Sequence, residues 1–163
     1  MKNYKIRLYK EVVMLLNIKL SIFFALCCCV CVTQVQARYL GRLSDNPYEA
    51  DSIANPYGRY GSRYSPDSIN NPYGEFGSEY DLHSVRNRYA SGDDSPKLYD
   101  AEGNFRGNLN NNPYDPDSIA NPHGRYGSRH SPDSINNPYG VANPYNPDSP
   151  RNAYGRGWEI RYE

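Results

Sequence analysis

The chain has 163 residues, with 18 basic and 18 acidic side chains, and 38% of its residues are hydrophobic. This length allows one ordinary domain. The balanced charge argues against a strongly basic nucleic-acid-binding protein and against an acidic tail protein. These averages mislead, because the first 37 residues and the remaining 126 differ in composition.

The first 37 residues have the features of a secretory signal peptide in the correct order. An uncharged apolar run of 13 residues, from Leu20 to Val32, follows Lys19, and Val35-Gln36-Ala37 places small residues before a cut after Ala37. The run is short for a membrane span, which needs about 20 apolar residues. We therefore expect cleavage after Ala37, with an uncleaved anchor as the alternative. Translation from Met14 instead of Met1 would give a shorter signal, ending at the same Ala37, whose size is more usual.

All four cysteines of the chain lie in this apolar run, at Cys27, Cys28, Cys29 and Cys31. A lipid-acceptor cysteine would follow a small residue, but Leu26, Val30 or another cysteine precedes each of these. We interpret them as small hydrophobic residues of the signal core. After cleavage no cysteine is left for a disulfide, although export would permit one. Removal of the leader, with a net charge of +4, leaves a chain with a net charge of −4.

The composition after Ala37 is typical of low complexity. Leu, Ile, Val and Phe supply 14 of 126 residues, which is about 11%, below the roughly 20% that a conventional core needs. Gly, Pro and Ser supply 40 of these residues, which exceeds the usual range for globular domains. The chain is therefore either disordered or held in a turn-rich fold by tyrosine, proline and isoleucine packing.

Internal repeats organise this part of the chain. The segments 46–74 and 112–140 are identical at 25 of 29 positions. A shorter repeat, D-S-I-x-N-P-Y-G, begins at Asp51 and again at Asp67, and the second unit has the same pair at Asp117 and Asp133. A weaker copy begins at Asp148, at a spacing one residue shorter. We divide the chain into a signal peptide (1–37), repeat unit 1 (38–74), a divergent connector (75–103), repeat unit 2 (104–140) and a degenerate repeat with a C-terminal strand (141–163).

The local patterns predict turns and a few short strands. Asn-Pro-Tyr-Gly has the residue preferences of a type I β-turn. Ser65 to Ile69 predicts a single helical turn with Ile69 as its buried anchor, ended by Asn71-Pro72. A β-hairpin is expected at 97–109, a strand at 157–162, and a further strand at 39–43. The expected fold is mostly coil and turn, with a few short β-strands, single helical turns, an N-terminal signal helix and partial disorder.

The motifs YGSxYSPDSINNPYG and LYDxxGxFRGxL, with NPYDPDSIANP, resemble a class of short predicted secreted bacterial repeat proteins of uncharacterised activity. The resemblance covers nearly all of 38–163. It implies export and a repeat architecture, and it carries no activity and no functional residues.

The recurring carboxylates have a structural explanation. Each aspartate of the short repeat precedes a serine where a turn needs a cap, so we expect capping by Asp51, Asp67, Asp117, Asp133 and Asp148 in place of catalysis. The stretches Asp115-Pro116-Asp117 and Asp100 to Asn104 suggest calcium, but neither completes a calcium loop. We therefore interpret them as plain turns.

Other site chemistry is weakly supported. His123 and His130 stand where the first unit has Tyr57 and Tyr64, and His83 lies elsewhere. A structural zinc site needs about four convergent ligands, so we interpret the histidines as packing groups. Nucleophile-elbow and phosphate-loop motifs are absent from the sequence. We predict no catalytic, cofactor-binding or metal-binding residues.

These observations favour an exported, non-enzymatic protein, secreted or periplasmic, with a structural or interaction role at the cell envelope. We expect a partner of unknown identity, either an envelope glycan or a protein, no nucleic acid, and membrane contact only through the uncleaved signal segment. The alternative is an extracellular ligand-binding module that contacts glycan or peptide through tyrosine and arginine. The tyrosines themselves are expected mainly to pack on prolines and hold the repeats together.

Overall fold

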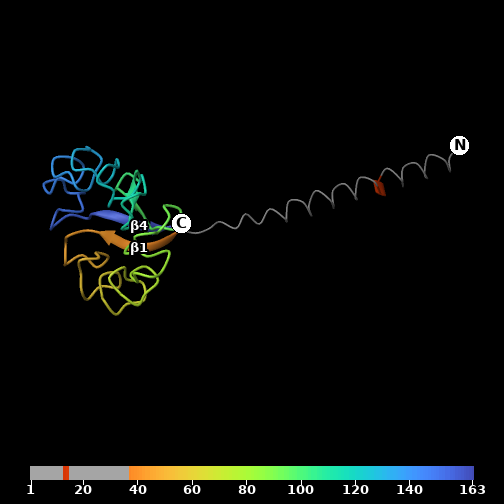
Figure 1. Ribbon diagram of the computed structural model, residues 1–163. Helices are drawn as coiled ribbons and strands as arrows, with labels where there is room; N and C mark the ends of the chain where they lie inside the picture. Colours follow the sequence, from red (N-terminus) through yellow and green to blue (C-terminus); the bar gives the residue numbers. More distant parts are fainter. Residues whose placement is uncertain (1–12, 15–36) are drawn as a thin grey trace. The chain divides into compact units, whose positions relative to one another are not determined.

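The computed structural model describes residues 13–14 and 37–163, so the predicted signal core and its cysteines lie outside the described residues. Residues 37–163 lie in one compact unit, seen as the coloured body in Figure 1. Of the two alternatives that the composition left open, a disordered chain and a turn-rich fold, residues 37–163 therefore adopt the turn-rich fold. In these ranges we find no helix with the length and apolar character needed to cross a membrane.

Four short strands form one antiparallel sheet. They are β1 (Arg38–Leu43), β2 (Lys97–Tyr99), β3 (Phe105–Asn108) and β4 (Trp158–Tyr162), in the order β1-β4-β2-β3. The hairpin predicted at 97–109 is confirmed as β2 and β3, and the strands predicted at both ends of the folded part are confirmed as β1 and β4. In Figure 1, β1 and β4 lie side by side between the yellow and the blue turns.

The core is small and centred on this sheet. Its buried members come from strands and from the turns that pack on them: Leu40, Ile69, Phe76, Leu98, Leu109, Trp158 and Ile160. Most of the few aliphatic residues counted in the sequence thus lie in this cluster or pack against it. Ile69 is 5% exposed, which confirms its role as a buried anchor.

The remaining chain is a series of β-turns that share their corner residues. The Ser52 N–H donates to the Glu49 carbonyl (3.2 Å), Asn55 donates to Ser52 (3.2 Å), and Gly58 donates to Asn55 (3.1 Å). One four-residue step, from Gly58 to Ser62 (3.0 Å), interrupts these three-residue steps. Together, four turns that advance the chain by three residues and one that advances it by four span the distance between successive copies of the short repeat. The spacing to the last copy is one residue shorter, because the step after Gly140 covers three residues, whereas the step after Gly58 covers four.

The segment Ser65 to Ile69 is a β-turn and not the expected helical turn. The Ser68 N–H donates to the Ser65 carbonyl at 3.3 Å, and the next turn then begins at Ser68, with Asn71 donating back to it at 3.2 Å. Asn70 cannot continue a helix because its N–H is already bonded to the Ser68 hydroxyl at 3.1 Å. The local serine bond has therefore replaced a helical bond.

Corner serines and asparagines stabilise the turns with their side chains. The Ser68 hydroxyl donates to the Tyr60 carbonyl eight residues earlier (2.8 Å), and the Asn71 amide donates to the Ser65 carbonyl two corners earlier (3.0 Å). Equivalent serines of the repeat are completely buried: Ser52, Ser68, Ser84, Ser118, Ser134 and Ser149. Buried carbonyl groups are thereby paired without a regular sheet or helix.

The same bonds continue through the segment predicted as a divergent connector. The Ser84 hydroxyl donates to the Phe76 carbonyl (3.2 Å), and the Asn87 amide donates to the Asp81 carbonyl (3.0 Å). Residues 75–90 thus form a third copy of the short repeat in the first half of the chain. Its sequence signal is S-V-x-N-x-Y beginning at Ser84, which follows S-I-x-N-x-Y at Ser68 with the spacing of the other copies.

The two halves of the folded part are built alike and exchange strands. Each half runs from a strand through three copies of the repeat to a second strand. The first strand of each half pairs with the last strand of the other half, as β1 with β4 and β3 with β2. The central pair, β2 with β4, also joins the two halves.

Candidate binding surface

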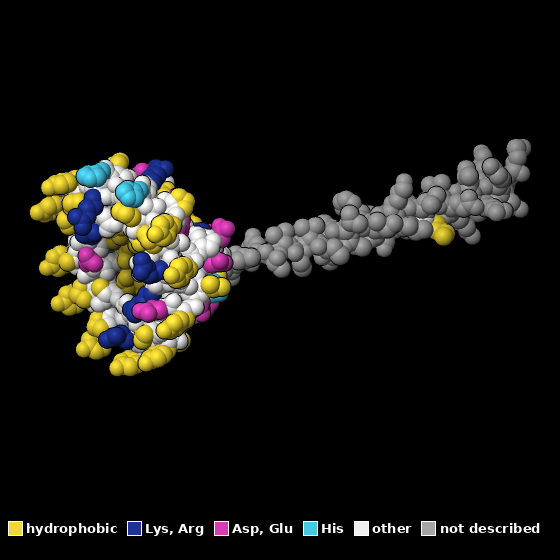
Figure 2. Space-filling model, in the orientation of Figure 1, with side chains coloured by type: hydrophobic (Ala, Val, Ile, Leu, Met, Phe, Trp, Pro, Cys, Tyr) yellow, Lys and Arg dark blue, Asp and Glu magenta, His cyan; other side chains and the backbone are white. Residues whose placement is uncertain are grey.

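Ten tyrosines of the folded part are almost completely exposed, at 87% to 96% of their surface. We name them the tyrosine array: Tyr48, Tyr57, Tyr64, Tyr73, Tyr80, Tyr89, Tyr114, Tyr139, Tyr145 and Tyr154. Figure 2 shows hydrophobic side chains standing out around the body. The expectation that the tyrosines mainly pack on prolines is therefore wrong for these ten of the fifteen tyrosines after Ala37.

Turn geometry explains this exposure. Every array tyrosine stands two residues after a turn corner, and its backbone N–H donates to the corner side chain, as Tyr57 does to Asn55 (3.0 Å) and Tyr64 to Ser62 (3.3 Å). These Asx-type and serine-type bonds hold the backbone of the tyrosine against the turn. The side chain therefore projects away from the turn into solvent, whether the turn reads Asn-Pro-Tyr or Ser-Arg-Tyr.

Two histidines occupy array positions in the second half. The His123 N–H donates to Asn121 (2.9 Å) and the His130 N–H to Ser128 (3.3 Å), as the tyrosines do elsewhere, and both side chains are exposed. His83 lies apart from them, with its ring 5.1 Å from that of Tyr162. Within 13–14 and 37–163, no three His, Cys, Asp or Glu side chains gather as a metal site would require.

The other five tyrosines have a different role. Tyr39 meets Tyr60 edge-on with ring centroids 5.3 Å apart, and Tyr126 meets Phe105 at the same distance. Tyr39 and Tyr60 are half-buried and Tyr126 is 8% exposed. These aromatic pairs stabilise the packing of the first turns of each half on the sheet. The tyrosines of residues 37–163 thus divide into packing residues and array residues.

Two of the repeated aspartates pair with arginine in place of capping a turn. Asp67 accepts from Arg59 at 2.7 Å and from Arg38 at 2.9 Å, and these hydrogen bonds hold the pKa of its carboxyl below the usual value. Asp133 accepts from Arg125 at 2.7 Å in the second half. The capping expected of these aspartates is wrong at these positions, because the serine two residues earlier supplies the cap.

The two stretches considered for calcium use their carboxylates internally. Asp100 accepts from the Asn104 N–H (2.8 Å) and from Arg106 (2.8 Å). Burial alone would raise the pKa of Asp100, but the hydrogen bonds from Asn104 and Arg106 outweigh it and the pKa is lowered. Asp115 accepts from the amide groups of Asn108 (3.0 Å) and Asn110 (2.8 Å). Both stretches therefore act as hydrogen-bonded turns.

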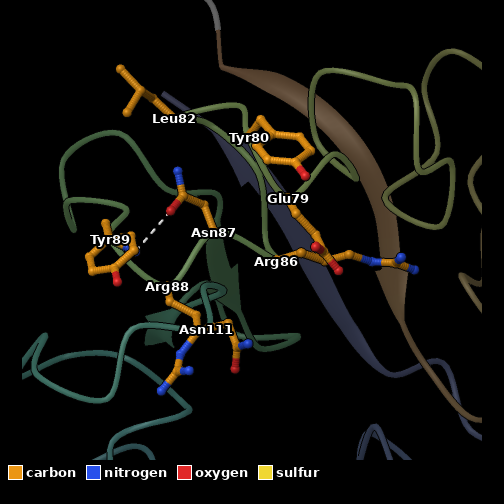
Figure 3. A pocket seen from close by; sticks show the side chains of 8 residues that line it. All are labelled: Glu79, Tyr80, Leu82, Arg86, Asn87, Arg88, Tyr89 and Asn111. Carbon is orange, nitrogen blue, oxygen red and sulfur yellow. Dashed lines mark hydrogen bonds between the residues drawn. The ribbon is translucent and has the colours of Figure 1, made fainter.

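A groove of about 520 Å³ lies between two neighbouring members of the array, Tyr80 and Tyr89. We name it the Arg88 groove. Its other lining residues include Glu79, Leu82, Arg86, Arg88 and Asn111. Figure 3 shows Tyr80 and Tyr89 on different sides of it, with Arg88 beside Asn111 and the Arg86 side chain extending away from Arg88. Sequence reasoning missed this groove because it lies in the copy that was not recognised as a repeat.

Comparison with protein-family models, curated proteins and solved structures finds no match to this chain.

Proposed function

We propose that the protein is an exported, non-enzymatic interaction protein of the cell envelope, and that the tyrosine array is its binding surface. The main support for this proposal is that ten tyrosines, each at the same position of its own turn, are exposed. An exposed tyrosine ring offers apolar area that gains about 25 cal/mol per Å² when a partner covers it. Its hydroxyl remains available for a hydrogen bond at the rim of the contact. The signal-peptide features of residues 1–37 support export.

The regular placement of the tyrosines favours a repetitive ligand. Because each array tyrosine is fixed to a turn corner, successive rings are presented in the same way along the chain. Weak contacts that repeat on one rigid surface add up to strong binding when the ligand also repeats. Hydrogen-bonded turns also reduce the ordering cost of binding. A glycan polymer of the envelope fits these requirements, because each pyranose ring has an apolar C–H face and polar hydroxyl groups.

The charged residues of the repeats support binding more than catalysis. A hydrolytic pair needs two carboxyl groups that converge in a cleft. Asp67 and Asp133 are instead neutralised by arginines, and Asp51 accepts a hydrogen bond from the Tyr39 hydroxyl at 3.3 Å. These carboxylates stabilise the turns.

Retention on purified envelope glycan tests the proposal. The compact unit 36–163 is compared with a variant in which Tyr57, Tyr64 and Tyr73 are changed to alanine, and with the matched variant that carries phenylalanine. We expect retention of the unchanged chain, loss of most retention with alanine and near-complete retention with phenylalanine. Equal retention of all three chains would show that the array is not the binding surface. Retention only on envelope protein would replace glycan by protein as the partner.

A further inference from the structure

We propose that the Arg88 groove is a specific site for a saccharide that carries a carboxylate group. This inference rests on the proposed function, because it assigns the ligand class of one part of the same surface. It begins from the departures of residues 75–90 from the other copies of the repeat.

Four of the departures from the preceding copy line the groove. Leu82 stands where the preceding copy has Pro66, and Arg86 stands where it has Asn70. At two further positions of the groove, Glu79 replaces Arg63 and Arg88 replaces Pro72. All four new side chains line the groove, whereas the two array tyrosines beside them, Tyr80 and Tyr89, follow the repeat. Residues 75–90 have thus kept the turns of the repeat, while four of the side chains that line the groove have changed.

The change at Arg86 removes scaffold contacts. In the preceding copy, the Asn70 amide donates to the Ile53 carbonyl (2.8 Å) and to the Gly61 carbonyl (3.1 Å). Asn136 makes the equivalent bonds in the second half, at 3.0 and 2.9 Å. Arg86 has no such side-chain bond to the described residues. A scaffold residue has therefore been replaced by a cation that lines the groove.

The charged groups of the groove are available to a ligand. Among the residues that the structure describes, the side chains of Glu79, Arg86 and Arg88 form no ion pair or hydrogen bond with one another or with other groups. Arg59 and Arg125, in contrast, are each paired with an aspartate at 2.7 Å. Two guanidinium groups against one carboxylate give the groove a net positive charge. It therefore favours an anion, and the planar arginine fork suits a carboxylate.

The rest of the groove fits a sugar. Tyr80 and Tyr89 are 92% and 90% exposed and Leu82 is 61% exposed, so the groove has apolar walls for the C–H faces of a pyranose. Sugar hydroxyls both donate and accept, and the Glu79 carboxylate and the Asn111 amide supply partners of both kinds. The volume of about 520 Å³ is within the range of small-ligand sites.

Calorimetric titration with trigalacturonate tests the site, and its fully methyl-esterified form is the matched neutral ligand. We expect the acid to bind the compact unit 36–163 and the ester to bind about tenfold or more weakly, since a hydrogen-bonded charge is lost. Arg88→Gln should weaken binding of the acid by about the same factor. Arg63→Gln removes an exposed arginine outside the groove and should leave the affinity unchanged. Raising the salt concentration should weaken binding of the acid.

Three results would overturn the inference: equal affinity for acid and ester, equal effects of Arg88→Gln and Arg63→Gln, or binding of an acidic peptide in place of the sugar. Tyr80→Ala should also weaken binding of the acid, which separates a groove contact from general charge attraction. The proposed function stands if the array variants lose retention on glycan while Arg88→Gln has no effect on trigalacturonate. In that case only the ligand class of the groove is wrong.

Discussion

The Ser68 hydroxyl donates a 2.8 Å hydrogen bond to the carbonyl oxygen of Tyr60, which precedes it by eight residues. The same bond recurs from Ser52 to Ser44 (2.9 Å) and from Ser118 to Asn110 (3.2 Å). It joins consecutive loops of the chain where no strand is present. The serines of the repeat are thus the internal framework of the fold.

Changing Ser68 to alanine should lower the free energy of unfolding by about 1–3 kcal/mol, because a buried carbonyl and the Asn70 N–H both lose their partner. Urea denaturation of the compact unit measures the change. Ser62→Ala is the control, because this half-buried serine caps only the Tyr64 N–H, at 3.3 Å. A cost for Ser62→Ala equal to that for Ser68→Ala would contradict the framework role of the buried serine.

Gly41 and Gly103 form a matched pair. Both have positive φ, at 93° and 81°, but a Cβ on Gly41 would lie 2.6 Å from the Tyr60 Cβ, whereas a Cβ on Gly103 has nothing within 4 Å. Gly103→Ala should cost about 1–2 kcal/mol from backbone strain alone. Gly41→Ala should cost at least about 1 kcal/mol more, because β1 must move away from Tyr60. Equal costs in thermal unfolding would show that the close approach is easily relieved.

Tyr39 should ionise late in an alkaline titration. Partial burial, aided by the nearby Asp51 carboxylate, raises its pKa to about 12. The unfolded value is about 10, so the stability that neutral Tyr39 contributes is complete below pH about 10 and is lost as the pH rises towards 12. The ultraviolet absorbance of tyrosinate should show a step near pH 12 that Tyr39→Phe removes. Persistence of this step in the variant would assign it to another residue.

Chemical nitration should divide the tyrosines of the compact unit into two groups. A reagent that must reach the ring should modify array positions such as Tyr57, which is 96% exposed, before Tyr126, which is 8% exposed. Peptide mapping by mass spectrometry after brief treatment measures the order. Modification of Tyr126 at the rate of Tyr57 would show that the packing against Phe105 is not maintained in solution.

The strands were predictable because their signals are local. The hairpin of β2 and β3 follows from two short apolar runs around a turn, and β1 follows from its match to β3. The helical turn at Ser65 was predicted wrongly because serine followed by proline and aspartate is typical of both a helix start and an isolated turn. The Ser68 hydroxyl decides between them, because it accepts from the Asn70 N–H while it donates to the Tyr60 carbonyl eight residues away. The second of these contacts leaves no signal within one turn.

The binding surface was harder to predict than the strands. Tyrosine is equally suited to packing and to exposure, and only its position relative to the turn corner separates Tyr60 from Tyr57. The Arg88 groove was missed because its copy of the repeat has lost both prolines and the aspartate before the serine, and its remaining signal is S-V-x-N-x-Y beginning at Ser84. The buried serine and the corner asparagine persist in this copy, whereas Glu79, Leu82, Arg86 and Arg88 of the groove depart from the repeat.

The exchange of strands between the halves has a consequence for the integrity of the molecule. A chain that stopped after β2 would hold β1 and β2 without β4, the strand that pairs with both of them. Two copies of such a chain could rebuild the whole sheet, each completing the other. The two halves thus pair as the subunits of a symmetric dimer would, and the loop at Asp100 is the covalent link that makes their association independent of concentration.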